Sequence, residues 1–519
     1  MAHETIDEIG EDELAPEDPA SRLAAATAAA LKGGDTSRLG TKLPARERLA
    51  LLLDAGSFVE DGLLASMHDE RLPADAVITG TGTVGGVQVA VITHDPTVKA
   101  GSWGPRTVEK QIRILERADR DLLPVFFLVD SAGGRLTDQI GFHPGPRGAA
   151  RIFHLQVRLS GRVPQICCLF GPSAAGGAYM PAFCDWVGMV DGNASMFLAS
   201  PRIAEKAVGE VVSLEEMGGA RMHTEVSGCG DELCADDADA IAQAKRFFSY
   251  LPPSYEDRPG PLPAREPAAT EWEGVIPENL RSAYDIGQVI ERVVDAESFF
   301  EVKARWAKEI VVGFARLDGE AIGIVASQPN VKTGAIQVNS ADKAASFISL
   351  CDCFNLPLVF LTDLPGFMIG SKVEREGIIR HGAKMIAAMA STQVPRICVV
   401  IRKAFAAGYY AMSCPGFEPR ATIALPSAQI GAMASEAAVN AVSARHLAAM
   451  ETDAEREAFI AKHKVEFEQE LEPLRLASEL LIDAVVEPTE LRRELILRLQ
   501  AAANWSAPQP GRHHGNFPV

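Results

Sequence analysis

The sequence RVPQICCLFGPSAAGGAY, residues 162–179, is answered later in the chain by QVPRICVVIRKAFAAGYY, residues 393–410. In both stretches a run rich in β-branched and apolar residues leads into a short segment of alanine and glycine. The apolar run predicts a buried strand, and the small residues predict a tight loop that opens a helix. One chain therefore carries two similar strand–loop–helix units.

The similarity extends well beyond these two stretches and indicates an internal duplication. Asp130 and Asp363 are 233 positions apart, Pro164 and Pro395 are 231 apart, and we pair Ala175 with Ala407 at 232. Such a constant separation over successive segments is hard to obtain by chance. Three further segment pairs follow the same order: LLLDAGSFVED (51–61) with RVVDAESFFEV (292–302), TVGGVQVAVITHD (83–95) with RLDGEAIGIVASQ (316–328), and LPVFFLVDSAGG (123–134) with LPLVFLTDLPGF (356–367).

Each half alternates continuous apolar runs with alanine-rich helical stretches. Continuous apolar strands separated by helices predict sheets that are covered on both faces, so we expect an α/β fold with one layered domain in each half. Seven prolines between Leu251 and Pro277 predict a linker. The predicted organisation is an acidic, disordered tail (1–20), a first domain (21–255), the linker (256–277) and a second domain (278–519).

The charge balance argues against a nucleic-acid or membrane partner. The formal net charge is −19, with 50 Lys and Arg against 69 Asp and Glu, so no general excess of cations is available for phosphates. No 18-residue apolar run or secretory signal is visible. The nine cysteines form no paired CxxC motifs, which predicts reduced thiols and a cytoplasmic location.

Several catalytic motifs can be set aside. GTGTVG (80–85) has the spacing of a dinucleotide-binding loop, but strand-like residues flank it on both sides, so we expect a hairpin turn. There is no GxSxG elbow, P-loop or HExxH, and the eleven histidines show no metal-ligand spacing, so no metal site is predicted. Lys384 lacks the Met-Lys-Met setting of a biotin attachment site.

The two small-residue loops remain as candidates for chemistry. At a strand-to-helix junction the first backbone N–H groups have no intrahelical partner, and glycine or alanine allows a ligand oxygen to approach them. A pair of such donors is an oxyanion hole for an oxygen that gains negative charge. The alternative is a turn that needs small residues only for close packing. Two loops at equivalent places favour the oxyanion-hole interpretation.

The sequence resembles a known family, the carboxyltransferase (β) subunits of biotin-dependent acyl-CoA carboxylases, which include propionyl-CoA and methylcrotonoyl-CoA carboxylases. The resemblance runs from about residue 40 to the C-terminus. The segments that show the resemblance most clearly are HDPTVKAGSWG (94–104), LVDSAGGR (128–135), SGRVPQICCLFGPSAAGGAYMPAFCDWVGMV (160–190), EEMGGARMHTEVSG (215–228), FFEVKARWAKEIVVGFARLDGEAIGIVASQP (299–329), FLTDLPGFMIG (360–370) and GIIRHGAKMIAAMA (377–390).

The resemblance implies two tandem crotonase-like (ClpP/crotonase spiral) domains. The first would bind the coenzyme A thioester, and the second would bind carboxybiotin delivered by a biotin carboxylase/biotin carrier (α) subunit. It also implies an active site between protomers of a homohexamer, a trimer of dimers. The cofactor itself would supply the base that removes the α-proton, and the enolate would then be carboxylated at the α-carbon or at a vinylogous γ-carbon.

Residue roles follow from the same resemblance. The oxyanion hole for the thioester falls on the amides of Ala175 and Gly176, and the hole for the biotin ureido oxygen falls on Ala407 and Gly408. Tyr410 stands where propionyl-type members have Asp, in the acyl pocket. The predicted substrate-binding residues are Gly133, Gly177, Tyr410, Lys99 and Arg135, with Arg147 a further candidate for the coenzyme A phosphates.

Three alternatives stay open at this stage. The same loops would serve a carboxyltransferase that runs in reverse in a decarboxylase or transcarboxylase assembly. A non-catalytic structural subunit could also keep the duplicated fold. The acyl group is open as well, and a short saturated, a branched or unsaturated, or a longer chain all fit the sequence.

Overall fold

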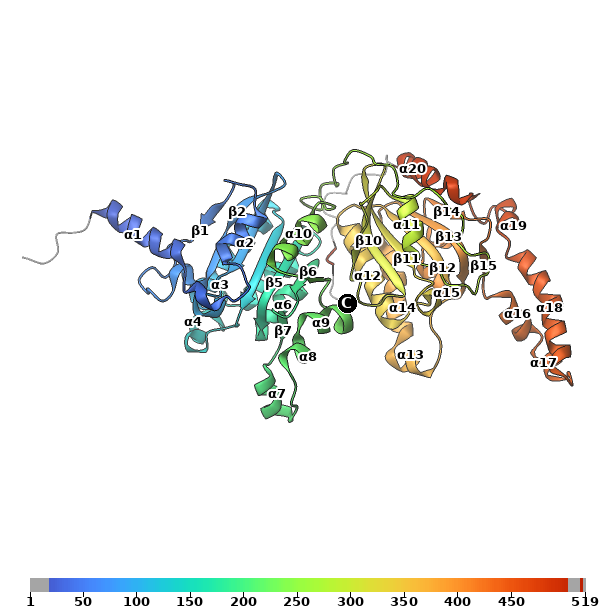
Figure 1. Ribbon diagram of the computed structural model, residues 1–519, viewed down its shortest axis with the longest axis horizontal. Coiled ribbons are helices and arrows are strands. Elements are labelled where there is room, and N and C mark those ends of the chain that lie inside the picture. Colours follow the sequence, from blue (N-terminus) through green and yellow to red (C-terminus); the bar gives the residue numbers. More distant parts are fainter. Residues whose placement is uncertain (1–17, 503–513, 517–519) are drawn as a thin grey trace, which may run out of the picture.

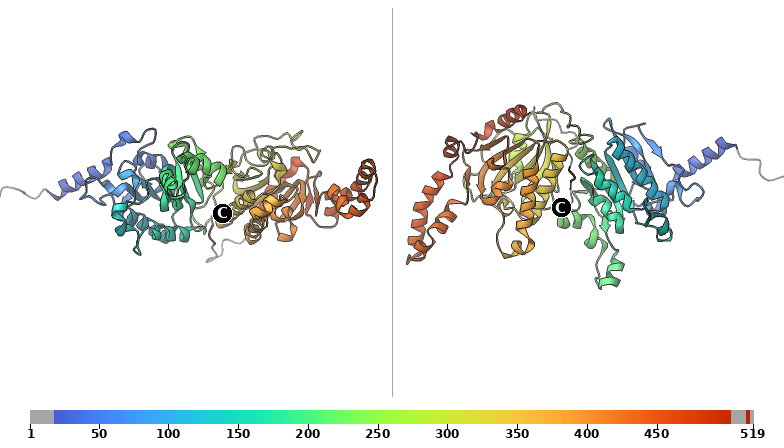
Figure 2. Two further views of the ribbon diagram at one scale, coloured as in Figure 1. Left: turned by 90° about the horizontal axis from the view of Figure 1, so that it is seen from below. Right: turned by 180° about the vertical axis from the view of Figure 1, so that it is seen from behind.

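The computed structural model describes residues 18–502 and 514–516. Within them the chain forms two halves, each built on its own sheet, with helix α1 at one end of the molecule and helices α16–α18 at the other (Figures 1 and 2). Residues 1–17 of the predicted acidic tail lie outside the described residues, whereas Pro19 and Ala20 begin α1.

The first half contains an eight-stranded mixed sheet. The strand order is β1-β2-β3-β4-β5-β6-β8, with β7 also paired to β5; β1, β2 and β3 are antiparallel and the remaining pairs are parallel. The strands are β1 Val59–Asp61, β2 Val77–Val84, β3 Val87–His94, β4 Val125–Ser131, β5 Gln165–Ala174, β6 Trp186–Val190, β7 Ser195–Phe197 and β8 Glu232–Cys234.

The second half repeats this topology strand by strand. Its eight-stranded sheet has the order β16-β14-β13-β12-β11-β10-β9, with β15 also paired to β13. The α/β fold and the internal duplication predicted from the sequence are therefore confirmed. The strands are β9 Phe300–Val302, β10 Ile310–Leu317, β11 Glu320–Ser327, β12 Leu358–Leu364, β13 Arg396–Phe405, β14 Ala421–Ala424, β15 Gln429–Gly431 and β16 Ala484–Val485.

Helices connect and cover the strands in both halves. Those of the first half are α1 Pro19–Lys32, α2 Ala45–Leu52, α3 Pro105–Asp121, α4 Gln139–Phe142, α5 Ala150–Leu159, α6 Tyr179–Ala182, α7 Pro201–Val208, α8 Leu214–Gly218, α9 Ala220–Met222 and α10 Asp237–Phe248. Those of the second half are α11 Gly287–Val293, α12 Val338–Cys353, α13 Ser371–Glu376, α14 Ile378–Ser391, α15 Ala406–Ala411, α16 Ser435–Val442, α17 Ala444–Ala448, α18 Asp453–Glu470, α19 Pro473–Ser478 and α20 Leu491–Ala501.

Two sequence expectations about local structure are confirmed. GTGTVG closes a β-hairpin, because β2 and β3 pair antiparallel up to Val84 and Val87. The proline-rich region contains no helix or strand between Phe248 and Gly287. The residue boundaries of the two domains stay a prediction.

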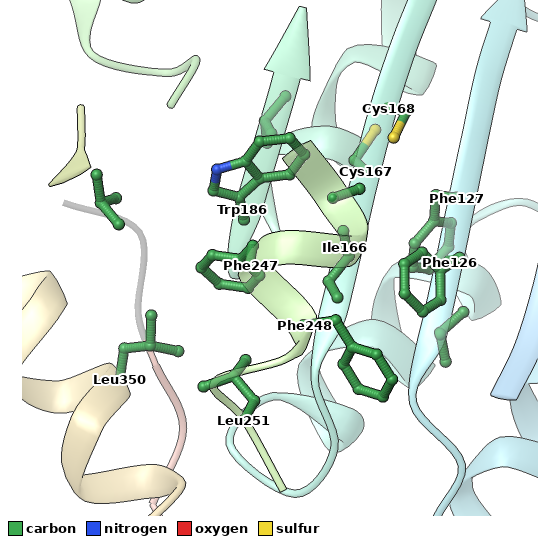
Figure 3. Packing of buried hydrophobic residues seen from close by; sticks show 14 of the residues in the cluster. Phe126, Phe127, Ile166, Cys167, Cys168, Trp186, Phe247, Phe248, Leu251 and Leu350 are labelled. Carbon is green, nitrogen blue, oxygen red and sulfur yellow. The ribbon is translucent and has the colours of Figure 1, made fainter. Parts of the chain in front are cut away.

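Helix α10 joins the two halves through a shared hydrophobic core. Phe247 stacks on Trp186 of the first sheet, with ring centroids 5.7 Å apart, and meets Phe314 of the second sheet edge to face at 5.5 Å. Figure 3 shows Phe247 and Leu251 between the first sheet and Leu350 of α12. Aromatic pairs of this kind stabilise packing beyond the area that they bury, and one hydrophobic core therefore extends across both halves.

Within the described residues, no helix has the length and apolar character needed to cross a membrane. All nine cysteines are free thiols, and most of them are buried among apolar side chains. The pKa of the Cys168 thiol is raised by burial, as is that of Cys351. These thiols pack as small apolar residues.

The duplication preserves a buried lysine in each half. Lys343 on α12 donates to the carbonyl oxygens of Lys303, Trp306 and Ile310 at 2.9–3.0 Å, and burial lowers its pKa to about 8. Lys110 on α3, 233 positions earlier, donates in the same way to Ala74 and Val77. Each ammonium group satisfies carbonyls of the irregular segment that leads into a sheet strand.

Replacing Lys343 with methionine tests this role. Methionine keeps the apolar stem and removes the donors. The Lys303 carbonyl keeps the Trp306 N–H as a donor, but those of Trp306 and Ile310 lose the ammonium group, at about 1–3 kcal/mol each, offset in part by the charge no longer buried. We expect the thermal unfolding temperature of Lys343→Met to fall by about 5 °C or more. Lys372→Met is the control, because the Lys372 side chain is 88% exposed and its loss should leave the unfolding temperature unchanged.

Candidate active site

Each half places its glycine–alanine loop where a strand changes neighbours. Strand β5 pairs first with β6, from Ile166 to Leu169, and then with β7, from Pro172 to Ala174. Strand β13 does the same with β14 and β15. The loop follows at once, as η5 (Ala175–Ala178) and α6 in the first half and as α15 in the second. The predicted strand–loop–helix units are thus confirmed.

The two loops share one backbone conformation. Ala175 and Ala406 both lie in the left-handed region, with φ of 54° and 53°, and in both loops the first two residues are exposed and the third is buried. The separation of equivalent residues is therefore 231 here, and our pairing of Ala175 with Ala407 at 232 is wrong by one residue. The ungapped match of residues 162–179 with 393–410 gives the same separation of 231.

With the corrected pairing, Gly176 corresponds to Ala407 and Gly177 to Gly408. The four residues predicted to form oxyanion holes lie within the tripeptides 175–177 and 406–408. Because these residues open helical segments, their amides have no intrahelical acceptors. Each loop can present backbone donors to an oxygen at the protein surface.

The space around the loops differs between the halves. A methyl group built on Gly176 would meet no atom within 4 Å, whereas one on Gly408 would overlap the Leu364 side chain and come within 2.7 Å of the Gly366 Cα. Glycine is therefore required for packing at Gly408, while Gly176 lies open. The first loop has the freer approach.

A second backbone segment lies against each loop. Gly133 has φ of 86°, and a Cβ there would be 3.0 Å from the carbonyl oxygen of Ala174. Gly366, 233 positions later, has φ of 129° and lies in the same way against Phe405. The predicted substrate residue Gly133 is thus next to the first loop, and only glycine suits its conformation.

An aromatic pair lies beneath the first loop. The Trp103 ring is 3.7 Å from the position of a Cβ built on Gly177, and its Nε1 donates to Nε2 of the buried His94 at 3.0 Å. Burial lowers the pKa of His94 to about 4, so the ring stays neutral and can accept this bond. Sequence reasoning quoted the segment that contains both residues but gave them no role.

The three cationic side chains predicted to bind the coenzyme A thioester differ in exposure and in their partners. The Arg135 side chain is 9% exposed and is held by Asp75, Ser102 and Thr107, with 2.6 Å to the Asp75 carboxylate. Its guanidinium is thus engaged by groups of the protein itself, and contact with substrate stays a prediction. Arg147 is paired on the surface with two glutamates of α3. Lys99 is exposed, with φ of 47°, and stays a candidate for an anionic ligand.

An exposed tyrosine lies shortly after each loop. Tyr410 is 51% exposed, and Tyr179, its equivalent at the separation of 231, is 47% exposed. Tyr179 was missed in the sequence, although the repeat itself could have identified it. Among the described residues, no group of three or more His, Cys, Asp or Glu side chains could hold a metal ion.

Comparison with known proteins gives long and consistent matches. Residues 38–517 match the carboxyl transferase domain family. The chain is 52% identical to the uncharacterized carboxylase YngE of Bacillus subtilis (strain 168), over 94% of this chain and 97% of that protein. It is 37% identical to the carboxyltransferase subunit of propionyl-CoA carboxylase of Haloferax mediterranei, over 94% and 97%.

A solved structure extends the match to three dimensions. The crystal structure of transcarboxylase 12S, with methylmalonyl-coenzyme A and methylmalonic acid bound, has a TM-score of 0.89 and 36% sequence identity, and the match covers 98% of this chain and 100% of that chain. That protein assembles as a hexamer. The resemblance covers both sheets and both loops.

The His94–Trp103 pair predicts a specific pH dependence of stability. His94 is neutral in the folded protein down to about pH 4, whereas it binds a proton near pH 6.5 when unfolded. Stability should therefore fall as pH decreases from 6.5 to 4, by at most about 3 kcal/mol from this group. His94→Gln, which keeps an acceptor but does not titrate, should unfold with a shallower pH dependence in denaturant titrations at pH 4–7. Parallel profiles for the two proteins would contradict this assignment.

Proposed function

The chain belongs to the carboxyl transferase family, and from that premise we propose that it transfers a carboxyl group from carboxybiotin, carried by a partner subunit, to an acyl-CoA. It is a carboxyltransferase subunit of a biotin-dependent acyl-CoA carboxylase, with two tandem crotonase-like domains. The observation that carries the proposal is the pair of equivalent, exposed backbone loops, one in each domain.

In the first domain, the amides of Ala175 and Gly176 would bind the thioester oxygen. When the α-proton leaves, that oxygen gains negative charge as the enolate forms. Preorganised donors stabilise the transition state because their interaction strengthens as this charge develops, and one such donor is worth about 3–4 kcal/mol. The open surroundings of Gly176 suit an oxygen that must approach the backbone closely.

In the second domain, the amides of Ala407 and Gly408 would bind the ureido oxygen of biotin. The exposure of Ala407 and the absence of ionisable residues in 406–408 fit a neutral ureido carbonyl. The cofactor, when bound, would supply both the carboxyl group and the base for the α-proton. This accounts for loops that offer backbone donors and no acid–base pair of their own.

The acyl group is proposed to be short. Tyr410 and Tyr179 are bulky, exposed side chains directly beyond the two loops, and the proposal is that they limit the length of the acyl chain. Relatives and structures of the family carry or act on propionyl-CoA and methylmalonyl-CoA. Lys99, Gly133 and Gly177 follow the C-terminal ends of the parallel strands β3, β4 and β5 and are proposed to contact the thioester. Carboxylation at a vinylogous γ-carbon stays possible for an unsaturated chain.

The assembly is proposed to be a homohexamer, a trimer of dimers, that works with a biotin carboxylase/biotin carrier subunit. Within one chain the two loops belong to different sheets, with α6 beside the first and α15 beside the second (Figure 1). A second copy would bring the first loop of one protomer to the second loop of another. The hexamer of the 12S relative supports this arrangement.

A transcarboxylase is the second candidate, because the 12S relative matches over the full chain. Its two half-reactions need the same two loops, since carboxyl transfer is reversible in direction. A decarboxylase assembly would use them in the reverse direction as well. The partner subunits decide among these, and the residues of this chain serve all of them.

The activity test combines the chain with a biotin-carrying carboxylase subunit, ATP and bicarbonate. Turnover is compared for acetyl-, propionyl- and methylcrotonoyl-CoA, and transfer of the carboxyl group from methylmalonyl-CoA to a second acyl-CoA without ATP is the transcarboxylase arm. We expect the highest kcat/KM with a short acyl-CoA in the ATP-dependent arm. Absence of carboxyl transfer with every acyl-CoA and every cognate partner would contradict the proposed function.

The loops are tested by removing single N–H donors. Gly176→Pro and Ala407→Pro delete one amide hydrogen at the start of a helical segment, where proline is tolerated. We expect kcat to fall by about 100-fold or more with the hexamer intact. Gly176→Ala is the matched control, because it keeps the N–H and has free space. Equal kcat values for the Pro and Ala variants would exclude the first loop as an oxyanion hole.

A further inference from the structure

We infer that two buried carboxylates, Asp130 and Asp363, are positioning residues that aim the two backbone loops. The inference rests on the proposed function and concerns residues that touch neither substrate nor cofactor. Each Asp lies near the end of a central strand, β4 or β12, and is at most 2% exposed. Each is the residue at which the pairing with the loop-bearing strand changes register.

The register change is the same in both sheets. In the first, Val129 pairs with Leu169 and Ser131 with Ser173, so the three residues from Phe170 to Pro172 lie opposite Asp130. In the second, Thr362 pairs with Val400 and Leu364 with Ala404, so three residues lie opposite Asp363. Such a bulge bends its strand. The bent end then pairs with β7 or β15 and carries the loop.

Asp363 closes the second bulge directly. One carboxylate oxygen accepts from the Arg402 Nε at 2.7 Å, and the other accepts from the Lys403 backbone N–H at 3.3 Å. Arg402 also donates to the carbonyl oxygens of Pro277 and Asn279 at the end of the linker. Both bonded residues lie inside the bulge, three and four positions before Ala406, so a shift here moves the loop.

Asp130 closes the first bulge by a different route. Its carboxylate fills the space beside Gly171, where any side chain would overlap it. The cations come from outside the strand, with Lys42 at 2.8 Å and Arg48 at 3.3 Å. The Arg48 guanidinium also lies 4.2 Å from the ring centre of Phe170. The two halves therefore keep the buried carboxylate and differ in which residues balance its charge.

A positioning role explains why Asp130 and Asp363 are buried, although burying their charge does not by itself increase the free energy of unfolding. A buried ion pair is often no more stabilising than an apolar pair of the same size, whereas the loss of one partner leaves an unpaired charge. What the pair provides is a fixed geometry at the bulge. Oxyanion donors need this, since a misplacement of about 1 Å can reduce turnover by about 100-fold.

The test uses Asp130→Asn and Asp363→Asn in the full-length protein, assayed with the biotin-carrying subunit. Asparagine keeps the size and one acceptor oxygen but removes the charge. We expect kcat to fall by at least about tenfold, with the KM for acyl-CoA changed less than threefold and the hexamer retained. Hydrogen exchange by mass spectrometry should accelerate in residues 173–178 for Asp130→Asn and in residues 404–409 for Asp363→Asn.

A matched control separates positioning from general stability. Asp295 is buried and paired with Arg492 at 2.8 Å, but it binds the Asp318 and Gly319 amides at the opposite edge of the second sheet. Asp295→Asn should lower the unfolding temperature and leave kcat unchanged. Should Asp130→Asn or Asp363→Asn fail to fold, Arg48→Lys or Arg402→Lys replaces it. Each keeps the positive charge, weakens the bond to the carboxylate, and is measured by the same assays.

The outcomes are distinct. A fall in kcat with faster exchange confined to the matching loop supports the inference. It is overturned if kcat stays within twofold of the wild type, or if exchange rises across the whole domain as it does for Asp295→Asn. If the wild type itself transfers no carboxyl group, the proposed function fails, and the exchange pattern alone still decides whether Asp130 and Asp363 hold the loops.

Discussion

A backbone amide can serve as a catalytic donor only if its N–H group is held in a fixed orientation toward the ligand oxygen. That orientation is set by the strand end that leads into the loop. In this protein the constraint is met by a bulge in β5 and again in β13, each lying opposite a buried aspartate and each followed by a strand end that joins a new neighbour. The loops at Ala175 and Ala406 inherit their direction from these bulges. Both loops are exposed and begin with a residue of left-handed φ.

The duplication makes the two sites comparable residue by residue. Shared features, such as the buried lysines, the glycines at 133 and 366 and the aspartates at the bulges, are those that the sheet and the loops require. Features that differ mark specialisation. The first loop rests on Trp103 and has an open Gly176, whereas Ile336 takes the place of Trp103 in the second half and Gly408 is tightly packed. The two copies of one unit therefore differ in the space around their loops.

Burial decides which polar side chains are engaged by other groups of the protein, and a local sequence pattern does not show it. Arg135 stands in a motif that resembles substrate-binding segments, yet its guanidinium is enclosed by Asp75, Ser102 and Thr107. A cationic side chain in a loop cannot be assigned to a ligand from sequence alone, because it can form an ion pair with a carboxylate from a distant segment of the same chain. His94 is the reverse case, since its neutral state and its bond to Trp103 arise from burial that no local pattern reveals.

The sequence by itself determined the α/β class, the duplication, the hairpin at GTGTVG and the family, because periodicity, repeated order and long motifs are properties of the chain alone. Only the tertiary structure decided that Tyr179 and Tyr410 are both exposed, that the Arg135 guanidinium is enclosed, and that Asp130 and Asp363 lie opposite bulges. These depend on register between strands far apart in the sequence. Register is set by packing and by the balance of buried charge, which the order of residues within one segment does not encode.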